Sequence, residues 1–305
     1  MRVLVVGATG AIGSQLVPQL AERGHQVTGT SRTAARAGQL RALGAEPTVL
    51  DVLDEGAVRA VVEQARPDAI VYQATALTGI SFSRNMDRAF GPTNELRTRG
   101  TDILLAAAAK AGVPKFVGQS FAPFRYARTG GPVKDESDPL VADPGPSARL
   151  MFGAMAHNDE AITAAGGIAL RYGGFYGDKD DAMVAAVRKR QFPMIGDGGG
   201  IMSFIHLDDA AAATVLALDA AGPALYNVTD DEPAPMREWL PALAATVGAK
   251  PPYRVPRWVG GLFMGKMLPM MTEGRGASNA KAKRELGWTP RYPSWREGFR
   301  AAYGR

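Results

Sequence analysis

A glycine-rich segment near the start of the chain has the spacing of a dinucleotide-binding loop. It reads Gly7-Ala8-Thr9-Gly10-Ala11-Ile12-Gly13, follows a short β-branched run and precedes a stretch with helical period. In that setting the first glycine permits a tight turn, the second lets backbone approach a pyrophosphate, and the third lets helix and strand pack closely. The N-terminus of the helix then presents free N–H groups and a positive dipole end to the phosphates. We therefore predict dinucleotide contacts from Gly7, Thr9, Gly10, Ala11, Ile12 and Gly13.

The end of the second predicted strand favours NADP over NAD as the cofactor. Ser31 and Arg32 stand where an NAD-selective site usually has an acidic residue that binds the ribose 2′-hydroxyl. A carboxylate would repel a 2′-phosphate, whereas the Arg32 guanidinium can form a charge-assisted pair with it. Further cofactor contacts are expected after later strands, from Asp51, Val52, Gln73, Ala74, Thr75, Ala76, Tyr172 and Gly173.

The elements that must position these residues alternate between strands and helices. Strands are expected at Arg2–Val6, Gln26–Thr30, Glu46–Leu50, Ala69–Tyr72, Lys115–Gln119 and Ile168–Tyr172, and helices at Ile12–Arg23, Glu55–Gln64 and Asp102–Ala111. This alternation predicts the α/β class, with a doubly wound parallel sheet of Rossmann type. Glycine and proline become dense after Tyr172, which indicates a smaller, irregular C-terminal substrate lobe. We expect residues 1–172 to form the NADP-binding domain, with 201–222 returning to it, and 173–200 and 223–305 to form the substrate lobe.

Composition and charge narrow the class of protein. The 305 residues include no cysteine, which excludes disulfides, a thiol nucleophile and cysteine-ligated metals. The net charge of +5 comes from thinly spread Lys and Arg, so we expect no nucleic-acid partner. The one His beside two carboxylates, His206-Leu207-Asp208-Asp209, lacks metal-ligand spacing. The N-terminal apolar run is too short for a signal peptide, and no stretch approaches the ~20 apolar residues of a membrane helix. We expect a cytoplasmic protein that binds neither metal nor membrane.

Several segments together resemble the extended short-chain dehydrogenase/reductase family, also called NAD-dependent epimerase/dehydratases. They are the Gly7–Gly13 loop and residues 170–177, 203–210, 226–228 and 285–290. The resemblance implies a Rossmann domain and a small C-terminal lobe, with the active site in the cleft between them. It further implies a small-molecule substrate and a homodimer formed through a pair of helices.

The catalytic pair of that family has no counterpart in the matching segment. The family uses a Tyr-x-x-x-Lys pair, in which the Tyr exchanges a proton with the substrate oxygen. The Lys lowers the pKa of that Tyr and holds the nicotinamide ribose. These positions align with Phe152 and Ala156, and a slip of one residue would place Met151 and Met155 there instead. In neither register can the residues carry a proton or a charge.

Two further family positions also differ, and three functions stay open as a result. The Ser/Thr position aligns with Phe121 and an asparagine position with Arg97. We favour an oxidoreductase acting on a hydrophobic carbonyl or enone, with Tyr126 or Ser120 as the replacement proton donor and His157 ranked behind them. Tyr126 could equally pack on the cleft wall. The alternatives are a redox-neutral isomerase, dehydratase or cyclase, and a non-catalytic NADP(H) sensor.

Overall fold

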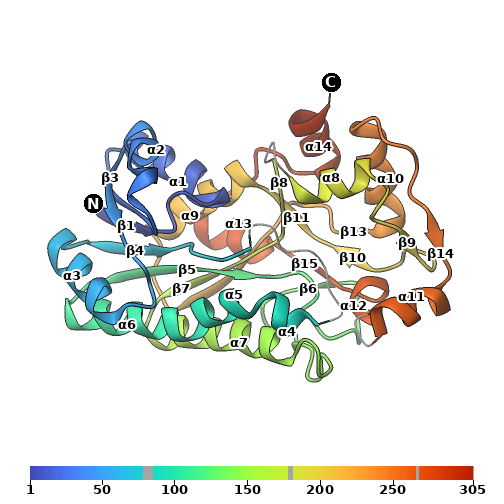
Figure 1. Ribbon diagram of the computed structural model, residues 1–305, viewed down its shortest axis with the longest axis horizontal. Coiled ribbons are helices and arrows are strands. Elements are labelled where there is room, and N and C mark those ends of the chain that lie inside the picture. The colour runs from blue at the N-terminus through green and yellow to red at the C-terminus, as the bar shows by residue number, and fades with distance from the viewer. Residues whose placement is uncertain (78–84, 178–180, 266–267, 305) are drawn as a thin grey trace.

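The computed structural model describes residues 1–77, 85–177, 181–265 and 268–304 (Figure 1). Its central sheet has seven parallel strands in the order β12-β7-β5-β4-β1-β2-β3. Their bounds are β1 Arg2–Val6, β2 Gln26–Ser31, β3 Ala45–Val49, β4 Ala69–Tyr72, β5 Lys115–Phe121, β7 Ile168–Tyr172 and β12 Ala224–Val228. The order reverses direction between β1 and β4, which is where a doubly wound sheet opens a crevice at the carboxyl ends of its strands. The predicted Rossmann-type α/β fold is confirmed.

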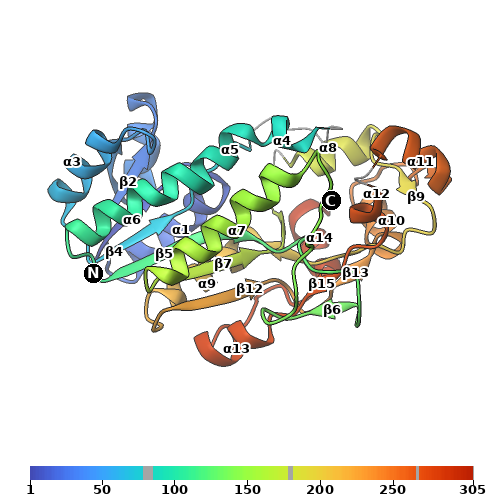
Figure 2. The same ribbon diagram turned by 90° about the horizontal axis from the view of Figure 1, so that it is seen from below.

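Helices cover both faces of the sheet. On one face lie α1 (Ala11–Glu22), α9 (Leu207–Ala217) and α13 (Ala280–Leu286); on the other lie α3 (Glu55–Ala65), α6 (Thr101–Lys110) and α7 (Arg149–Ala164). Figure 2 shows α6 and α7 running side by side across their face. The strands read as continuous apolar runs because both faces are buried. In β1, for example, Val3 and Val5 belong to the core beneath α1, and Leu4 and Val6 to the core beneath α3 and α6.

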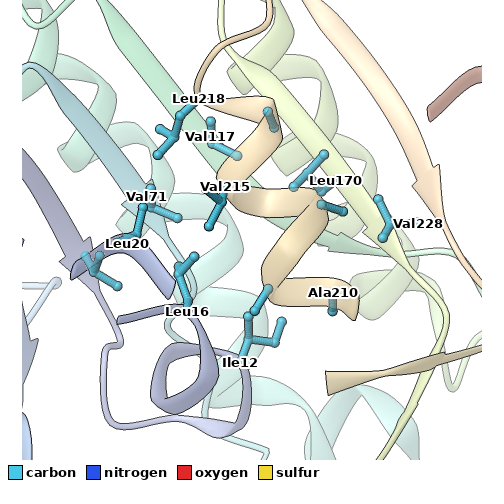
Figure 3. Packing of buried hydrophobic residues seen from close by; sticks show 14 of the residues in the cluster. Ile12, Leu16, Leu20, Val71, Val117, Leu170, Ala210, Val215, Leu218 and Val228 are labelled. Carbon is cyan, nitrogen blue, oxygen red and sulfur yellow. The ribbon is translucent and has the colours of Figure 1, made fainter. Parts of the chain in front are cut away.

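The packing of α1 on the sheet fixes the position of the glycine loop that precedes it. Ile12, Leu16 and Leu20 project from one face of α1 at helical spacing and are buried, as Figure 3 shows. They meet strand residues such as Val71 and Val117 and the facing helix α9. Because α1 begins directly after the loop, this packing holds its N-terminus at the carboxyl end of β1.

A smaller lobe lies at the other end of the molecule, on the right in Figure 1. Its elements are α8 (Ala182–Arg188), β9 (Met194–Ile195), β10 (Ile201–Met202), β13 (Ala234–Pro235), α10 (Met236–Thr246), β14 (Arg254–Val255), α11 (Arg257–Met264), α12 (Leu268–Thr272) and α14 (Trp295–Tyr303). Its core is aromatic, with Phe204, Trp239, Trp295 and Phe299 all buried. Two short parallel pairs complete the chain: β8 (Gly174–Tyr176) with β11 (Phe204–His206), and β6 (Val133–Lys134) with β15 (Gly276–Ala277).

The remaining short helices lie in the connections that follow β2 and β4. They are η1 (Ala34–Arg36), α2 (Ala37–Ala42), α4 (Met86–Ala89), α5 (Gly91–Glu95) and the π-helical turn η2 (Leu96–Gly100). Among the described residues, no helix combines the length and apolar character needed to cross a bilayer.

One expected domain boundary is wrong. Residues 223–305 were all expected in the substrate lobe, yet β12 pairs with β7 as the outermost strand of the central sheet. Helix α13 packs beside β12, and Trp288 is buried in the same core. The reason is that Tyr226 and Val228 bury their side chains in the core beneath the helices that cover the sheet. The pattern of a single strand does not show with which other strand it pairs.

Candidate functional site

The glycine loop is packed so tightly that only glycine fits at its ends. Gly7 has φ +92°, and a Cβ there would lie 2.6 Å from the backbone N of Ala74. A Cβ on Gly13 would lie 2.4 Å from the carbonyl O of Gly7. The N-cap residue Gly10 supplies no side-chain cap, so the first N–H groups of α1 can bind a ligand. This cradle fits the pyrophosphate of a nicotinamide dinucleotide, although the buried Ile12 side chain leaves only its backbone for contact.

The expected 2′-phosphate end of the site lies at the carboxyl end of β2. Ser31 is buried, and its hydroxyl donates to the Thr33 carbonyl at 2.7 Å, which fixes the turn. Arg32 is exposed and forms no ion pair within the described parts of the chain. Asp51 is also exposed, with Oδ1 accepting from the Leu53 N–H, whereas the side chain of Val52 is buried. Arg32 is therefore the cation free to meet a phosphate here.

The segment after β4 runs directly beneath the loop. The backbone of Gln73 and Ala74 lies against Gly7, and the Ala76 N–H donates to Thr93 Oγ1 at 3.1 Å. The Gln73 carbonyl accepts from the Gln119 side chain at 2.8 Å. The structure thus brings the expected cofactor segment, Gln73, Ala74, Thr75 and Ala76, to the same edge as the glycine loop.

Two further residues that were expected to contact the cofactor, Tyr172 and Gly173, are packed against other parts of the protein. Tyr172 has no exposed surface, and its hydroxyl lies 2.6 Å from Thr214 Oγ1 while accepting from Gln73 Nε2 at 3.1 Å. That side chain is part of the core beneath α9 rather than of the crevice. Gly173 faces the backbone of Phe204, where a Cβ would approach to 2.8 Å. The lack of a side chain at Gly173 therefore allows this segment to pack closely against the start of β11.

Helix α7 buries two methionines. Of the residues in the two possible registers for the family pair, Ala156 is exposed and Phe152 is buried, whereas Met151 and Met155 are both buried and lie one turn apart. Asp159 continues that buried face by another turn. No tyrosine or lysine occurs in α7. Met151 and Met155 can supply neither a proton nor a positive charge.

An apolar cluster surrounds the two methionines, which we call the methionine–phenylalanine cluster. Its members are Met86, Phe90, Phe121, Phe124, Val141, Ala148, Met151, Phe152, Met155, Met264 and Met270. Phe121 ends β5, where the family has its Ser/Thr, and Phe124 takes the left-handed conformation with φ +67°. These side chains come from both lobes, so the cluster closes the cleft with polarisable and aromatic groups.

Below this cluster, the two proposed proton donors are held in a buried polar network. Tyr126 is 1% exposed; its hydroxyl donates to Asn227 Oδ1 at 2.7 Å and accepts from Arg171 at 3.2 Å. Burial raises the pKa of the Tyr126 hydroxyl. Ser120 is 2% exposed and accepts from Arg125 at 3.1 Å. Because the Tyr126 hydroxyl already donates its proton to Asn227, this arrangement argues against a proton-donor role for Tyr126.

A cavity of about 490 Å³ opens beside α7. It is lined by Arg125, Leu140, Val141, Ala142, Asp143, Pro144, Arg149, Phe152, Gly153 and Ala156. Its walls are largely apolar, which suits a hydrophobic small molecule. His157 is not part of it, because that ring reaches Asp102 on α6 with Nε2 at 2.7 Å from Oδ1.

The structure also shows two candidate ligand-binding residues that the sequence motifs did not predict. Asn94 and Arg97 are buried beside the cluster, and neither the Asn94 amide atoms nor Arg97 Nε has a hydrogen-bond partner. Burial, and then the charge of Arg125, lower the pKa of Arg97 to about 10. In the sequence, the only indication of this site was that Arg97 aligns with an asparagine of the family.

The polar segment near β11 has a structural role. His206 Nδ1 accepts from the Asp208 N–H and caps α9, and the Asp209 carboxylate accepts from the backbone of Arg291 and Tyr292. The segment thereby ties the C-terminal tail to α9. In the described residues, no group of three or more His, Asp or Glu is placed to hold a metal.

Comparison with known proteins agrees with this architecture. Residues 3–229 match the model of the NAD dependent epimerase/dehydratase family. The chain is 40% identical to a 3-diazoavenalumate denitrifying reductase of Streptomyces sp, over 98% of this chain and 99% of that protein. It is 26% identical to a 2-alkyl-3-oxoalkanoate reductase of Stenotrophomonas maltophilia, over 82% of this chain and 76% of the other.

Solved structures give the same assignment. A UDP-glucose 4-epimerase of Thermus thermophilus in complex with NAD is 25% identical and superposes with a TM-score of 0.75, covering 99% of this chain and 98% of that one. A human epimerase family protein with NADPH is 21% identical, with a TM-score of 0.76 over 99% of both chains, and shows the shared fold. With its nicotinamide-dinucleotide fold and its reductase relatives, this chain is an enzyme of the short-chain dehydrogenase/reductase type and belongs to the NAD-dependent epimerase/dehydratase family.

Proposed function

We propose that this protein is an NADPH-dependent reductase whose substrate needs a hydride but no proton from the enzyme, and that the group reduced is a diazo group. The observation that carries the proposal is the buried face of α7, where Met151, Phe152 and Met155 include neither a tyrosine nor a lysine. An enzyme with no proton donor at this point is suited to an acceptor that requires none.

The stoichiometry of the two reductions separates the candidate substrates. A carbonyl that gains a hydride on carbon becomes an alkoxide, which must then be protonated, and general acids exist in such sites to do so. An arenediazonium ion R–N₂⁺ that gains a hydride becomes R–H and N₂. The C–N bond breaks, the positive charge is neutralised, NADPH becomes NADP⁺, and no net proton is taken up. The second reaction therefore matches an active site of apolar side chains.

The cofactor would be held by the residues already described. The loop from Gly7 to Gly13 and the start of α1 would bind the pyrophosphate, Arg32 the 2′-phosphate, and the segment Gln73–Ala76 would lie beneath the nicotinamide ribose. When bound, the reduced nicotinamide supplies the hydride.

The methionine–phenylalanine cluster suits an electrophilic, positively charged group. Aromatic faces attract cations, and thioether sulfurs are polarisable without being basic at neutral pH. Phe121 and Met155 would hold such a group and exclude water, which would otherwise attack it. Two kinds of relative bear on the choice of acceptor. One protein, 40% identical, is named for denitrifying a diazo compound, and two reductases of oxo compounds are 26% and 28% identical. The higher identity favours the diazo group over a carbonyl.

The test uses the diazonium salt of 3-aminocinnamate and a matched panel of aryl ketones and enones. We expect NADPH oxidation and N₂ release in equal amounts with the diazonium salt, above the rate without enzyme. We also expect a solvent isotope effect close to one in D₂O, because no proton is transferred. NADPH oxidation with the ketones alone would instead identify a ketoreductase, and turnover with no loss of NADPH absorbance would identify a redox-neutral enzyme. NADPH binding without turnover of any of these compounds would instead favour a non-catalytic NADP(H) sensor.

A further inference from the structure

A group of buried charges beneath the cleft is out of balance. Arg97, Arg125 and Arg171 are 6%, 1% and 5% exposed, and the carboxylate among them, Asp159, is 6% exposed. Asp159 Oδ2 accepts from Arg125 Nη1 at 2.7 Å and from Arg171 Nε at 2.8 Å. The charges of Arg125 and Asp159 both affect the pKa of Arg97, but Arg97 forms no ion pair within the described residues. Its guanidinium is therefore buried without a counter-ion.

Asn94 lies on the same buried face as Arg97 and is equally unsatisfied. The two residues are three positions apart across the junction of α5 and η2, so their side chains are neighbours. Asn94 is 9% exposed, and its Oδ1 and Nδ2 both lack a partner, as does Arg97 Nε. A buried amide and a buried cation left unpaired are both costly, so the pair calls for a ligand with negatively charged oxygen atoms.

The position of this pair links it to the reaction centre. Thr93, next to Asn94, accepts from the Ala76 N–H in the segment beneath the glycine loop. Asp159, whose charge acts on Arg97, lies one turn beyond Met155 on the inward face of α7. The pair is thus linked to the expected cofactor segment through Thr93, and α5 and η2, which carry the pair, pack against α7.

We propose that Asn94 and Arg97 form the binding site for the carboxylate of the substrate, which is an organic carboxylic acid. The planar guanidinium matches the two oxygens of a carboxylate, and Asn94 Nδ2 can donate a further hydrogen bond. The cofactor phosphates do not compete for this site, since their cradle is at the N-terminus of α1. This proposal rests on the proposed function, because it names the class of acid that the reductase binds.

Calorimetric titration of the NADP⁺-saturated protein tests the site without any turnover. The probes are trans-cinnamate and its neutral isostere trans-cinnamamide. We expect the wild-type protein to bind the acid about tenfold or more tightly than the amide. Arg97→Gln should weaken acid binding by about 10- to 100-fold and leave amide binding and the NADP⁺ affinity unchanged. Arg97→Lys should keep part of the preference for the acid over the amide, since lysine retains the positive charge but cannot donate two parallel hydrogen bonds to a carboxylate.

Arg99→Gln is the matched control, because Arg99 is in the same helical turn but its side chain is 59% exposed and pairs with Glu95. It should leave both affinities unchanged. Circular dichroism confirms that the Arg97 variants are folded. Equal binding of acid and amide by the wild-type protein, or a preference that survives Arg97→Gln, would overturn the site. Acid binding with no reduction of the diazonium salt would reject the proposed function alone, whereas equal reduction of acidic and neutral diazonium salts would reject the carboxylate site alone.

Discussion

Replacing Asp159 by asparagine should destabilise the protein more than any exposed carboxylate replacement. Asn has nearly the same shape as Asp, so the substitution removes the charge and leaves the packing of α7 in place. Arg125 and Arg171 both lose their counter-ion, and three buried guanidinium groups then repel one another. The variant therefore isolates the electrostatic role of the network.

The expected magnitude follows from the burial of these groups. Removing one partner of a buried ion pair costs about 3–5 kcal/mol, because the other charge is left uncompensated. Asp159 has two such partners, both 5% exposed or less, which places the expected loss at the upper end of this range. With the usual unfolding entropy per residue and a chain of this length, a loss at that upper end lowers Tm by roughly 6–8 °C.

Urea denaturation followed by circular dichroism measures the change in the free energy of unfolding, and thermal melts give the shift in Tm. Asp102→Asn is the control, because Asp102 pairs with His157 at the surface, where such pairs contribute about 0–1 kcal/mol. If Asp159→Asn costs no more than Asp102→Asn, the buried arginines are compensated in some other way. The account of an uncompensated Arg97 would then lose its physical basis.

Two further substitutions test the expected cofactor and the expected proton donor. Arg32→Ala should weaken NADPH binding about 10- to 100-fold and change NADH binding little, because only the 2′-phosphate loses its partner; equal losses for both would contradict the assignment. Tyr126→Phe removes the hydroxyl between Arg171 and Asn227 and should cost about 1–3 kcal/mol of stability, with turnover per folded molecule unchanged. A large fall in turnover with stability intact would instead make Tyr126 the proton donor.

The residues of α7 illustrate what sequence alignment does not decide, namely which side chains of a helix are buried. From the sequence, both Phe152 with Ala156 and Met151 with Met155 matched the family pair, and neither register offered a proton or a charge. Only the packing of α7 shows how these four residues lie: Ala156 is exposed, whereas Phe152 and both methionines are buried. A helix shows its period in the sequence, but which face turns inward depends on what it packs against.

The sequence by itself determined the alternation of strands and helices and the glycine loop, because these depend on local period and on backbone freedom at a few glycines. Tertiary structure alone decided that β12 joins the central sheet, that Tyr172 is a core residue, and that Tyr126 is occupied by Arg171 and Asn227. It also decided that Arg97 and Asn94 are buried without partners beside the cleft. Each of these outcomes is a contact between residues far apart in the chain, and local sequence carries no record of which distant groups will satisfy a charge or a hydrogen bond.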